Sequence, residues 1–284
     1  VQGNVYAAAT DGSGNLYVGG DFKVAGDVVA NTIAKWNGSN WSALGTGTNQ
    51  AVYALAVNGS NLYAGGSFYT AGGVAVNYVA KWDGLSWSAL GTGMNDGVRA
   101  LALDGSGNLY AGGLFVTAGG VSANRIAKWN GSSWSALGTG MNNQVHALAV
   151  SGSNLYAGGD FTTAGGVAAN YVAKWNGGGW SALGTGTNLW VRALSAGGSV
   201  LYAGGAFTQA GGVAANYVAK WDGSGWSAMG SGTDSYVYGL AASGSDVYAV
   251  GEFSSAGGTT VNRIAKWDGS SWSALGTGIS HSTY

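Results

Sequence analysis

The sequence predicts an all-β protein, a six-bladed β-propeller built from four-stranded antiparallel blades. The tract K-W-[ND]-G-x-x-W-S-A recurs along the whole chain at intervals of 46 or 47 residues. Its first tryptophan lies at Trp36, Trp82, Trp129, Trp175, Trp221 and Trp267. Self-similarity at a fixed period of this length indicates a repeat architecture. Four short β-type runs in each repeat, and a gradient of side-chain size along it, favour a propeller among the repeat folds.

The repeat at residues 143–188 shows the four predicted strands. Its first run, residues 145–150, alternates in polarity and ends at a Ser-Gly-Ser-Asn turn cluster. Further short runs occupy residues 155–161, 171–175 and 180–183. Glycine, with 55 residues in the chain, recurs too often for helices. We therefore expect one antiparallel meander in each repeat.

Glycine also shapes the predicted hairpins. The first hairpin turns at Asn58-Gly59 in one copy and at Asp104-Gly105 in the next, and both dipeptides supply the positive φ that tight turns need. The second run ends in a glycine pair such as Gly65-Gly66, which predicts a bulge or a close approach of another backbone. The sixth copy departs from this pattern, with Val250-Gly251 at the equivalent place.

The sizes of the side chains fit blades that are stacked around an axis. The first run is rich in alanine, as at Ala54 and Ala56, where blades of a propeller converge. The last two runs carry paired tryptophans, such as Trp129 and Trp134, which would fill the widening wedge between blades. An open linear stack needs no such gradient, so we expect the propeller instead.

The order of elements in each copy resembles the kelch repeat: a hydrophobic strand, a turn, a strand ending in a double glycine, and then a spaced aromatic pair. The pair here is Trp-x4-Trp, whereas kelch units more often place Tyr before Trp. The stretch AGG-V-x-x-N-x-[VI]-A-K-W is also similar to repeats of large secreted bacterial surface proteins. The resemblance covers the whole chain and implies a binding scaffold or, rarely, an enzyme.

The chain is predicted to form a single propeller domain, residues 1–284. Its six blades would cover approximately residues 1–48, 49–95, 96–142, 143–188, 189–234 and 235–284. Thr283 and Tyr284 fall in register with Val52 and Tyr53, so the tail could pair with the first strands. Otherwise face packing between blades closes the ring, or more sequence follows in a longer parent protein.

Composition and charge narrow the classes of partner. Hydrophobic residues make up 46% of the chain, enough for a sizeable core, but only 8% are charged, against about 25% in average domains. The net charge of −1 and the scattered single charges predict no nucleic-acid binding. No apolar run approaches the roughly 18 residues that span a bilayer, so we expect no membrane insertion.

The chain lacks cysteine, which excludes disulfides and thiolate metal sites without fixing a compartment. It begins at Val1 without methionine or a signal-peptide pattern. We therefore expect a piece of a larger protein that is secreted or displayed at the cell surface.

Variation between the copies marks the candidate binding site, because shared positions of a repeat serve the scaffold. The residue after the first-strand valine varies, and in chain order it is Tyr6, Tyr53, Arg99, His146, Arg192 and Tyr238. Neighbouring variable positions add Trp190, Tyr236, Asp96 and Gln144. Tyrosine, tryptophan and arginine dominate binding hot spots, so we expect a ligand at the mouth of the central channel. Alternatively, these side chains line a water-filled channel. The kelch resemblance implies a ligand site at this end for Arg99, His146 and Arg192 only.

Three repeated residue types have structural interpretations. The paired tryptophans could stack on sugars, but identical register on strands favours core packing, and removal of Trp129 should then cost about 3–5 kcal/mol. The repeated lysines, such as Lys35, should lie over neighbouring tryptophans, although six cations could bind a polyanion. The repeated asparagines, such as Asn31, should hold loop backbone by side-chain hydrogen bonds.

No catalytic residues, metal ligands or cofactor site can be assigned from the sequence. His146 and His281 are the only histidines, so neither a Ser-His-Asp set nor a histidine metal cluster is indicated. The Asp-Gly-Ser-Gly-Asn segments that begin at Asp11 and Asp104 offer too few carboxylates for a calcium loop, and we interpret them as turns.

These observations predict a non-enzymatic binding or scaffold module. Its ligand would be a protein or a glycan of unknown identity. A structural subunit of an extracellular fibre or surface layer is one alternative, since a nearly uncharged exterior favours self-association. A carbohydrate-binding lectin is the other.

Overall fold

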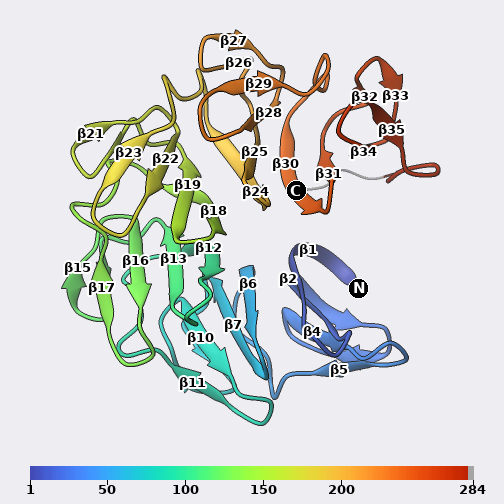
Figure 1. Cartoon of the computed structure of the whole chain (residues 1–284). Helices are drawn as coiled ribbons and strands as arrows, with labels where there is room; N and C mark the ends of the chain where they lie inside the picture. The colour runs from blue at the N-terminus through green and yellow to red at the C-terminus, as the bar shows by residue number, and fades with distance from the viewer. Residues whose placement is uncertain (281–284) are drawn as a thin grey trace. The chain divides into compact units, whose positions relative to one another are not determined.

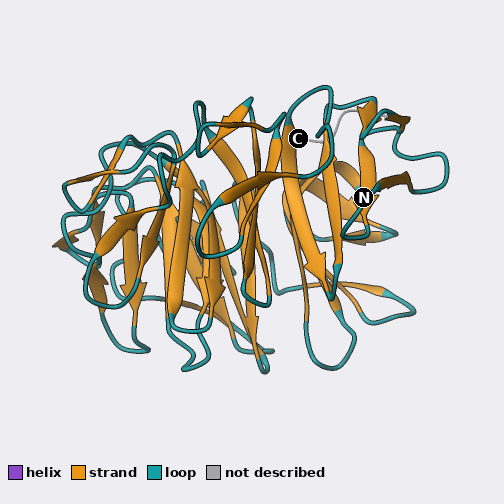
Figure 2. Cartoon of the chain, turned by 45° about the horizontal axis from the view of Figure 1, so that its top comes forward, coloured by secondary structure: helices purple, strands orange, loops and turns teal. Residues whose placement is uncertain are grey.

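The computed structural model describes residues 1–280, and every regular element in that part of the chain is a β-strand (Figures 1 and 2). The predicted tail positions His281, Thr283 and Tyr284 lie outside the described residues. The all-β, six-bladed propeller class is confirmed: six sheets each hold a four-stranded antiparallel meander in chain order. No helix within residues 1–280 has the length and apolar character needed to cross a membrane.

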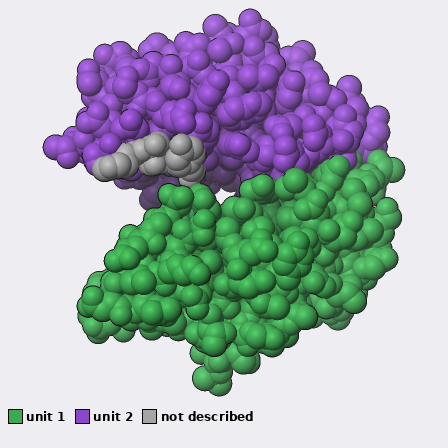
Figure 3. All heavy atoms as spheres, turned by 180° about the vertical axis from the view of Figure 1, so that it is seen from behind, with its two compact units in different colours: residues 1–140 green, residues 141–284 purple. Residues whose placement is uncertain are grey.

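The chain divides into two compact units, Val1–Gly140 and Met141–Tyr284 (Figure 3). Each unit contains three blades. The blade strands of the first unit are β1 (Gln2–Thr10), β2 (Leu16–Ala25), β4 (Ile33–Trp36) and β5 (Trp41–Ala43); β6 (Val52–Asn58), β7 (Asn61–Gly66), β10 (Val79–Trp82) and β11 (Trp87–Ala89); β12 (Val98–Leu103), β13 (Leu109–Gly113), β16 (Ile126–Trp129) and β17 (Trp134–Ala136).

The second unit repeats the same arrangement in blades four to six. Its blade strands are β18 (Val145–Ser151), β19 (Asn154–Gly159), β22 (Val172–Trp175) and β23 (Trp180–Ala182); β24 (Val191–Gly197), β25 (Val200–Gly205), β28 (Val218–Trp221) and β29 (Trp226–Ala228); β30 (Val237–Ser243), β31 (Asp246–Gly251), β34 (Ile264–Trp267) and β35 (Trp272–Ala274).

Each blade also carries a short outer hairpin that the four-strand prediction did not include. Glycine residues with positive φ, such as Gly72 and Gly73, turn the chain between its two-residue strands. In the first blade, β3 (Val28–Val29) pairs instead with the end of β2. The other hairpins are β8 (Thr70–Ala71) with β9 (Val74–Ala75), β14 (Thr117–Ala118) with β15 (Val121–Ser122), β20 (Thr163–Ala164) with β21 (Val167–Ala168), β26 (Gln209–Ala210) with β27 (Val213–Ala214), and β32 (Ser255–Ala256) with β33 (Thr259–Thr260).

The turn predictions succeed at one hairpin and fail at another. Gly59 has φ 59° between two directly paired strands, as the Asn-Gly dipeptide predicts. In the third blade the positive φ lies at Gly107, not at Gly105. The prediction was wrong there because the side chain of Asp104 organises a longer turn, accepting hydrogen bonds from the amides of Ser106 and Asn108, each at 2.9 Å.

The glycine pairs produce both effects that were predicted for them. Opposite Gly65 and Gly66, the register of the first strand shifts between Val52 and Ala54, which is a β-bulge. A Cβ at Gly65 would lie 2.5 Å from Cγ1 of Val98 in the next blade of the same unit. The pair therefore both permits the bulge and lets neighbouring blades approach closely.

Within each unit the first strands of neighbouring blades lie beside one another: β6 lies beside β1 and β12, and β24 lies beside β18 and β30. Their inward alanines are buried, among them Ala54 and Ala147. In blades two to six the second tryptophan of each pair is buried, as with Trp87, whose Nε1 donates a hydrogen bond of 2.8 Å to the carbonyl oxygen of Leu44 in the preceding blade. Small residues thus occupy the convergent part of each unit and indoles fill the wider part.

Candidate functional site

Six of the predicted site residues are the bulged residues of the first strands, and Trp190 and Tyr236 lie just before two of these strands. In every blade the register shift spans the position after the first-strand valine. The first unit carries Tyr6, Tyr53 and Arg99 there, and the second unit carries His146, Arg192 and Tyr238. A bulge adds one unpaired residue and re-aims its side chain, so these positions can vary without breaking the ladder.

In the first unit the three bulged residues form a contiguous row. The rings of Tyr6 and Tyr53 have centroids 5.6 Å apart. The guanidinium carbon of Arg99 lies 4.3 Å from the ring centroid of Tyr53, which is cation–π geometry. The Asp96 side chain accepts a hydrogen bond from the amide of Gly97 at 2.6 Å, so it caps the turn that leads into this row.

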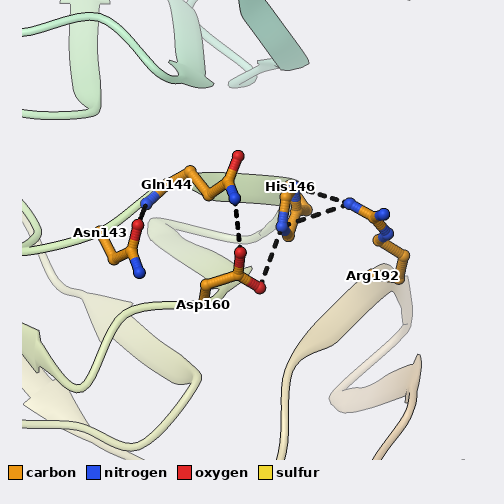
Figure 4. Close-up of polar contacts among 5 residues, drawn as sticks. All are labelled: Asn143, Gln144, His146, Asp160 and Arg192. Carbon is orange, nitrogen blue, oxygen red and sulfur yellow. Dashed lines mark hydrogen bonds and ion pairs between the residues drawn. The ribbon is translucent and has the colours of Figure 1, made fainter.

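In the second unit a polar network surrounds His146 (Figure 4). Asp160 Oδ1 lies 3.1 Å from His146 Nε2, and Gln144 Nε2 donates to Asp160 Oδ2 at 2.6 Å. Arg192 Nη1 lies 3.1 Å from His146 Nδ1 and 3.3 Å from Nε2. The imidazole is therefore held between an anion and a cation. Its side chain is only 6% exposed, whereas Arg192 is exposed to solvent.

An aromatic arm continues from Arg192. The guanidinium lies 5.3 Å from the ring centroid of Trp190, and Trp190 lies 5.3 Å from Tyr236 in a tilted arrangement. Tyr236 in turn contacts Tyr217 edge-on at 5.7 Å and Tyr238 at 6.3 Å. Tyr236 is 38% exposed. The structure thus brings together Trp190, Arg192, Tyr236 and Tyr238, with His146 at one end.

The Tyr238 phenol is held by a hydrogen bond to the Glu252 carboxylate. Burial, followed by a hydrogen bond to the Glu252 carboxylate and its charge, raises the pKa of Tyr238 to about 12. The phenol therefore stays neutral and donates to Glu252 at ordinary pH. This contact fixes one end of the aromatic arm.

The sequence analysis missed Asp160 and Glu252, which hold His146 and Tyr238. Asp160 follows the glycine pair of its blade and Glu252 follows the equivalent Val250-Gly251, at a position that varies while the next residue is always phenylalanine. In chain order the position holds Asp21, Ser67, Leu114, Asp160, Ala206 and Glu252. The same variation criterion that selected the bulged residues could have found it, because the glycine pair faces the bulge across the hairpin.

The interpretations of the other repeated residues are partly confirmed. All six repeated asparagines donate a side-chain hydrogen bond to a loop carbonyl fifteen residues later, as Asn170 does to Thr185 at 3.0 Å. Nζ of Lys35 and Nζ of Lys128 lie over the rings of Tyr17 and Tyr110, their cross-strand partners, each 5.6 Å from the ring centroid. Cross-strand pairing places these two ammonium groups beside tyrosines, and the packing of the lysine stems on tryptophans stays a prediction.

Few groups within residues 1–280 could ligate a metal ion together. No three histidine or acidic side chains of this part of the chain gather at one place. The Asp11 carboxylate is occupied by its own turn, since it accepts hydrogen bonds from the amides of Ser13 and Asn15 and from the Asn15 side chain. These bonds, with that of Asn15 first, lower the pKa of Asp11, although burial opposes them. The candidate site of the second unit therefore consists of aromatic, amide, guanidinium and carboxylate groups.

No protein-family model matches this sequence, and no curated protein matches it either. Solved structures with the same fold do exist. The computationally designed Ika8 protein is 17% identical, with a TM-score of 0.60 over 95% of this chain and 72% of its own. The RRP9 WD40 repeats are 15% identical, with a TM-score of 0.57 over 86% of this chain and 72% of theirs.

The extracellular domain of the putative one-component system BT4673 from B. thetaiotaomicron is also similar, at 13% identity and a TM-score of 0.58. The match covers 86% of this chain but only 31% of that domain, so this chain spans about a third of its length. At these identities the likeness shows a shared β-propeller fold.

Proposed function

We propose that this chain is a non-enzymatic binding module of the kelch-like type, belonging to a secreted or cell-surface protein. Its ligand would lie where the first strands begin, on the cluster of Gln144, His146, Asp160, Trp190, Arg192, Tyr236 and Tyr238. One observation carries the proposal: the copies differ at the bulged positions, at the residue before the first-strand valine and at the position of Asp160, and in the second unit these side chains contact one another in an unbroken series.

The composition of this cluster supports recognition. Tryptophan, tyrosine and arginine are enriched in binding hot spots because they present a large contact area with polar groups attached. Contacts among Asp160, His146 and Arg192 hold the polar groups in place before any ligand arrives. Such order reduces the entropy that binding must overcome.

A ligand-observed NMR screen with a library of saccharide, aromatic and carboxylate fragments tests this function. We expect several fragments to bind the wild type and to lose binding in an Arg192→Ala, Tyr236→Ala double variant. A Val213→Ser variant is the matched control, because Val213 is exposed on an outer hairpin of the same unit. Equal binding by the wild type and the double variant, or no binding by any fragment, would refute the proposed site.

A structural subunit is the second candidate, and one specific observation favours it. The outer hairpins of blades two to five expose a valine at the same register position, between 41% and 45%. These are Val74, Val121, Val167 and Val213. Repeated apolar side chains on a surface of low charge favour self-association. Light scattering over a concentration series should then show growth that Val167→Ser with Val213→Ser reduces, whereas a constant monomer would exclude this role.

A further inference from the structure

A second set of variable residues adopts left-handed backbone beside the candidate site. In each blade the residue after the repeated asparagine has a φ between 58° and 75°. These residues are Thr32, Tyr78, Arg125, Tyr171, Tyr217 and Arg263. Bulky residues are rare in this conformation, which glycine and asparagine adopt most readily. Five of the six positions nevertheless hold tyrosine or arginine, so we expect contacts of these side chains to compensate for the backbone strain.

The contacts made by the side chain at this position differ among the blades. The arginines at this position bind backbone carbonyls, Arg125 that of Leu114 and Arg263 that of Ile279. Tyr78 donates a hydrogen bond to the hydroxyl of Tyr69 at 3.0 Å. Tyr217 instead meets Tyr236 edge-on, so it adds a third ring to the row that begins at Trp190.

The chemistry of this row is specific. Three aromatic side chains, Trp190, Tyr236 and Tyr217, follow one another at centroid distances of 5.3 and 5.7 Å. Planar hydrogen-bonding groups lie at one end, where Arg192 stands over Trp190. Asp160 and Gln144 continue the polar end through His146.

The site holds two carboxylates, those of Asp160 and Glu252, and a single guanidinium, so it carries no excess of positive charge. Arg192 lies near His146, which is paired with Asp160, and Tyr238 donates to Glu252. A polyanion would meet these two carboxylates as well as the single guanidinium, so the site does not favour one. A pyranose suits it better: the C–H face of the ring packs on an aromatic face, and its edge hydroxyls both donate and accept hydrogen bonds.

We infer that the row Tyr217–Tyr236–Trp190, with Arg192, Asp160 and Gln144 at its polar end, binds a neutral oligosaccharide. The inference rests on the proposed binding function and names its ligand class. Sugar rings stack on the aromatic residues, and the polar end forms hydrogen bonds with the hydroxyls of one terminal or internal sugar. Because three aromatic rings follow in succession, a chain of several sugars makes more contact than a single one.

The probes are neutral hexasaccharides and disaccharides of glucose, mannose, xylose and N-acetylglucosamine, titrated by calorimetry into the full chain. We expect at least one hexasaccharide to bind and its disaccharide to bind about tenfold more weakly, a difference of about 1.4 kcal/mol. Tyr217→Ala should remove most of the advantage of the longer chain, whereas Tyr217→Phe should keep it. Trp190→Ala should abolish binding of both lengths.

Two controls separate loss of the site from loss of the fold. Circular dichroism spectra should match between each variant and the wild type, and Tyr217→Ala and Tyr78→Ala should lower the melting temperature to a similar extent, because both tyrosines pack against the hydrophobic core. Tyr78→Ala, at the equivalent position of the first unit, removes a tyrosine that contacts Tyr69 and should leave saccharide affinity unchanged.

The negative outcomes are distinguishable. If no neutral saccharide binds at about 5 mM, which corresponds to affinities too weak for recognition, the inference is overturned. When fragments of another class still bind and depend on Arg192 and Tyr236, the proposed function stands with a different ligand class, such as a peptide. A fragment screen without any hits overturns both. Saccharide binding that survives Trp190→Ala places the sugar elsewhere and also refutes the inference.

Discussion

The indole Nε1 of Trp226 donates a hydrogen bond of 2.8 Å to the carbonyl oxygen of Leu183, in the preceding blade of the same unit. Trp226 is buried, and its ring lies 5.5 Å from Trp221 at 56°. The same contact joins Trp272 to Met229 in the next blade. Trp87 and Trp134 make the equivalent bond in the first unit, so in these four blades the second tryptophan combines apolar burial with a directed bond to the preceding blade, which ties the two blades together more firmly than packing alone.

Replacement of Trp226 by alanine should lower the free energy of unfolding by about 3–5 kcal/mol, because it removes a buried indole and leaves a cavity. Chemical denaturation monitored by circular dichroism measures the change. Trp221→Ala should cost less, since Trp221 is only partly buried. The earlier expectation for Trp129 moves accordingly to its partner Trp134, which is the buried member of that pair. Equal costs for Trp221→Ala and Trp226→Ala would contradict this assignment.

Gly158→Ala should destabilise the protein by about 1–3 kcal/mol, as overpacking does. A Cβ at this position would lie 2.6 Å from Cγ1 of Val191 in the next blade. Gly179→Ala is the control, because nothing lies within 4 Å of a Cβ there. In a double-mutant cycle, Val191→Ala should recover part of the loss. A neutral Gly158→Ala variant would show that the blades are not in close contact at the glycine pair.

Tyr110 should ionise at an unusually high pH. Burial, then the charge of Asp104 and its hydrogen bond to the phenol, raise the pKa of Tyr110 to about 12. The neutral phenol therefore stabilises the fold fully below pH 10, and this contribution disappears as the pH rises through about 12. The Asp104→Asn substitution should lower the pKa of Tyr110 but leave it above 10, because the phenol remains buried. Spectrophotometric titration measures this change. Tyr156, whose pKa is raised by burial alone, serves as the reference, and an unchanged titration would reject the role of Asp104.

Arg192→Lys should weaken fragment or saccharide binding nearly as much as Arg192→Ala. Lysine keeps the charge but lacks the planar guanidinium, which stacks on Trp190 and contacts the His146 ring. The free energy of unfolding should change by less than about 0.5 kcal/mol because Arg192 is exposed. Full affinity in the lysine variant would mean that charge alone is recognised there.

Much of the fold could be predicted from the sequence because the repeat period, the β-type runs, the turn residues and the side-chain sizes all favoured the same architecture. The four runs of residues 143–188 correspond to β18, β19, β22 and β23. The hairpin at Gly72 and Gly73 was missed because strands of two residues leave no period to detect. The binding role, the ligand and the location of the protein remain predictions.

The sequence by itself determined the repeat, the strand order and the variable positions, because these depend on local patterns that recur six times. Only the tertiary structure decided what those positions do. The bulge at His146 arises from pairing with Gly158 and Gly159, and the approach of Arg192 depends on how two blades pack. Such contacts follow from register and blade spacing, which no local pattern of residues encodes. The row from Trp190 to Tyr217 therefore became visible only once the blades were in place.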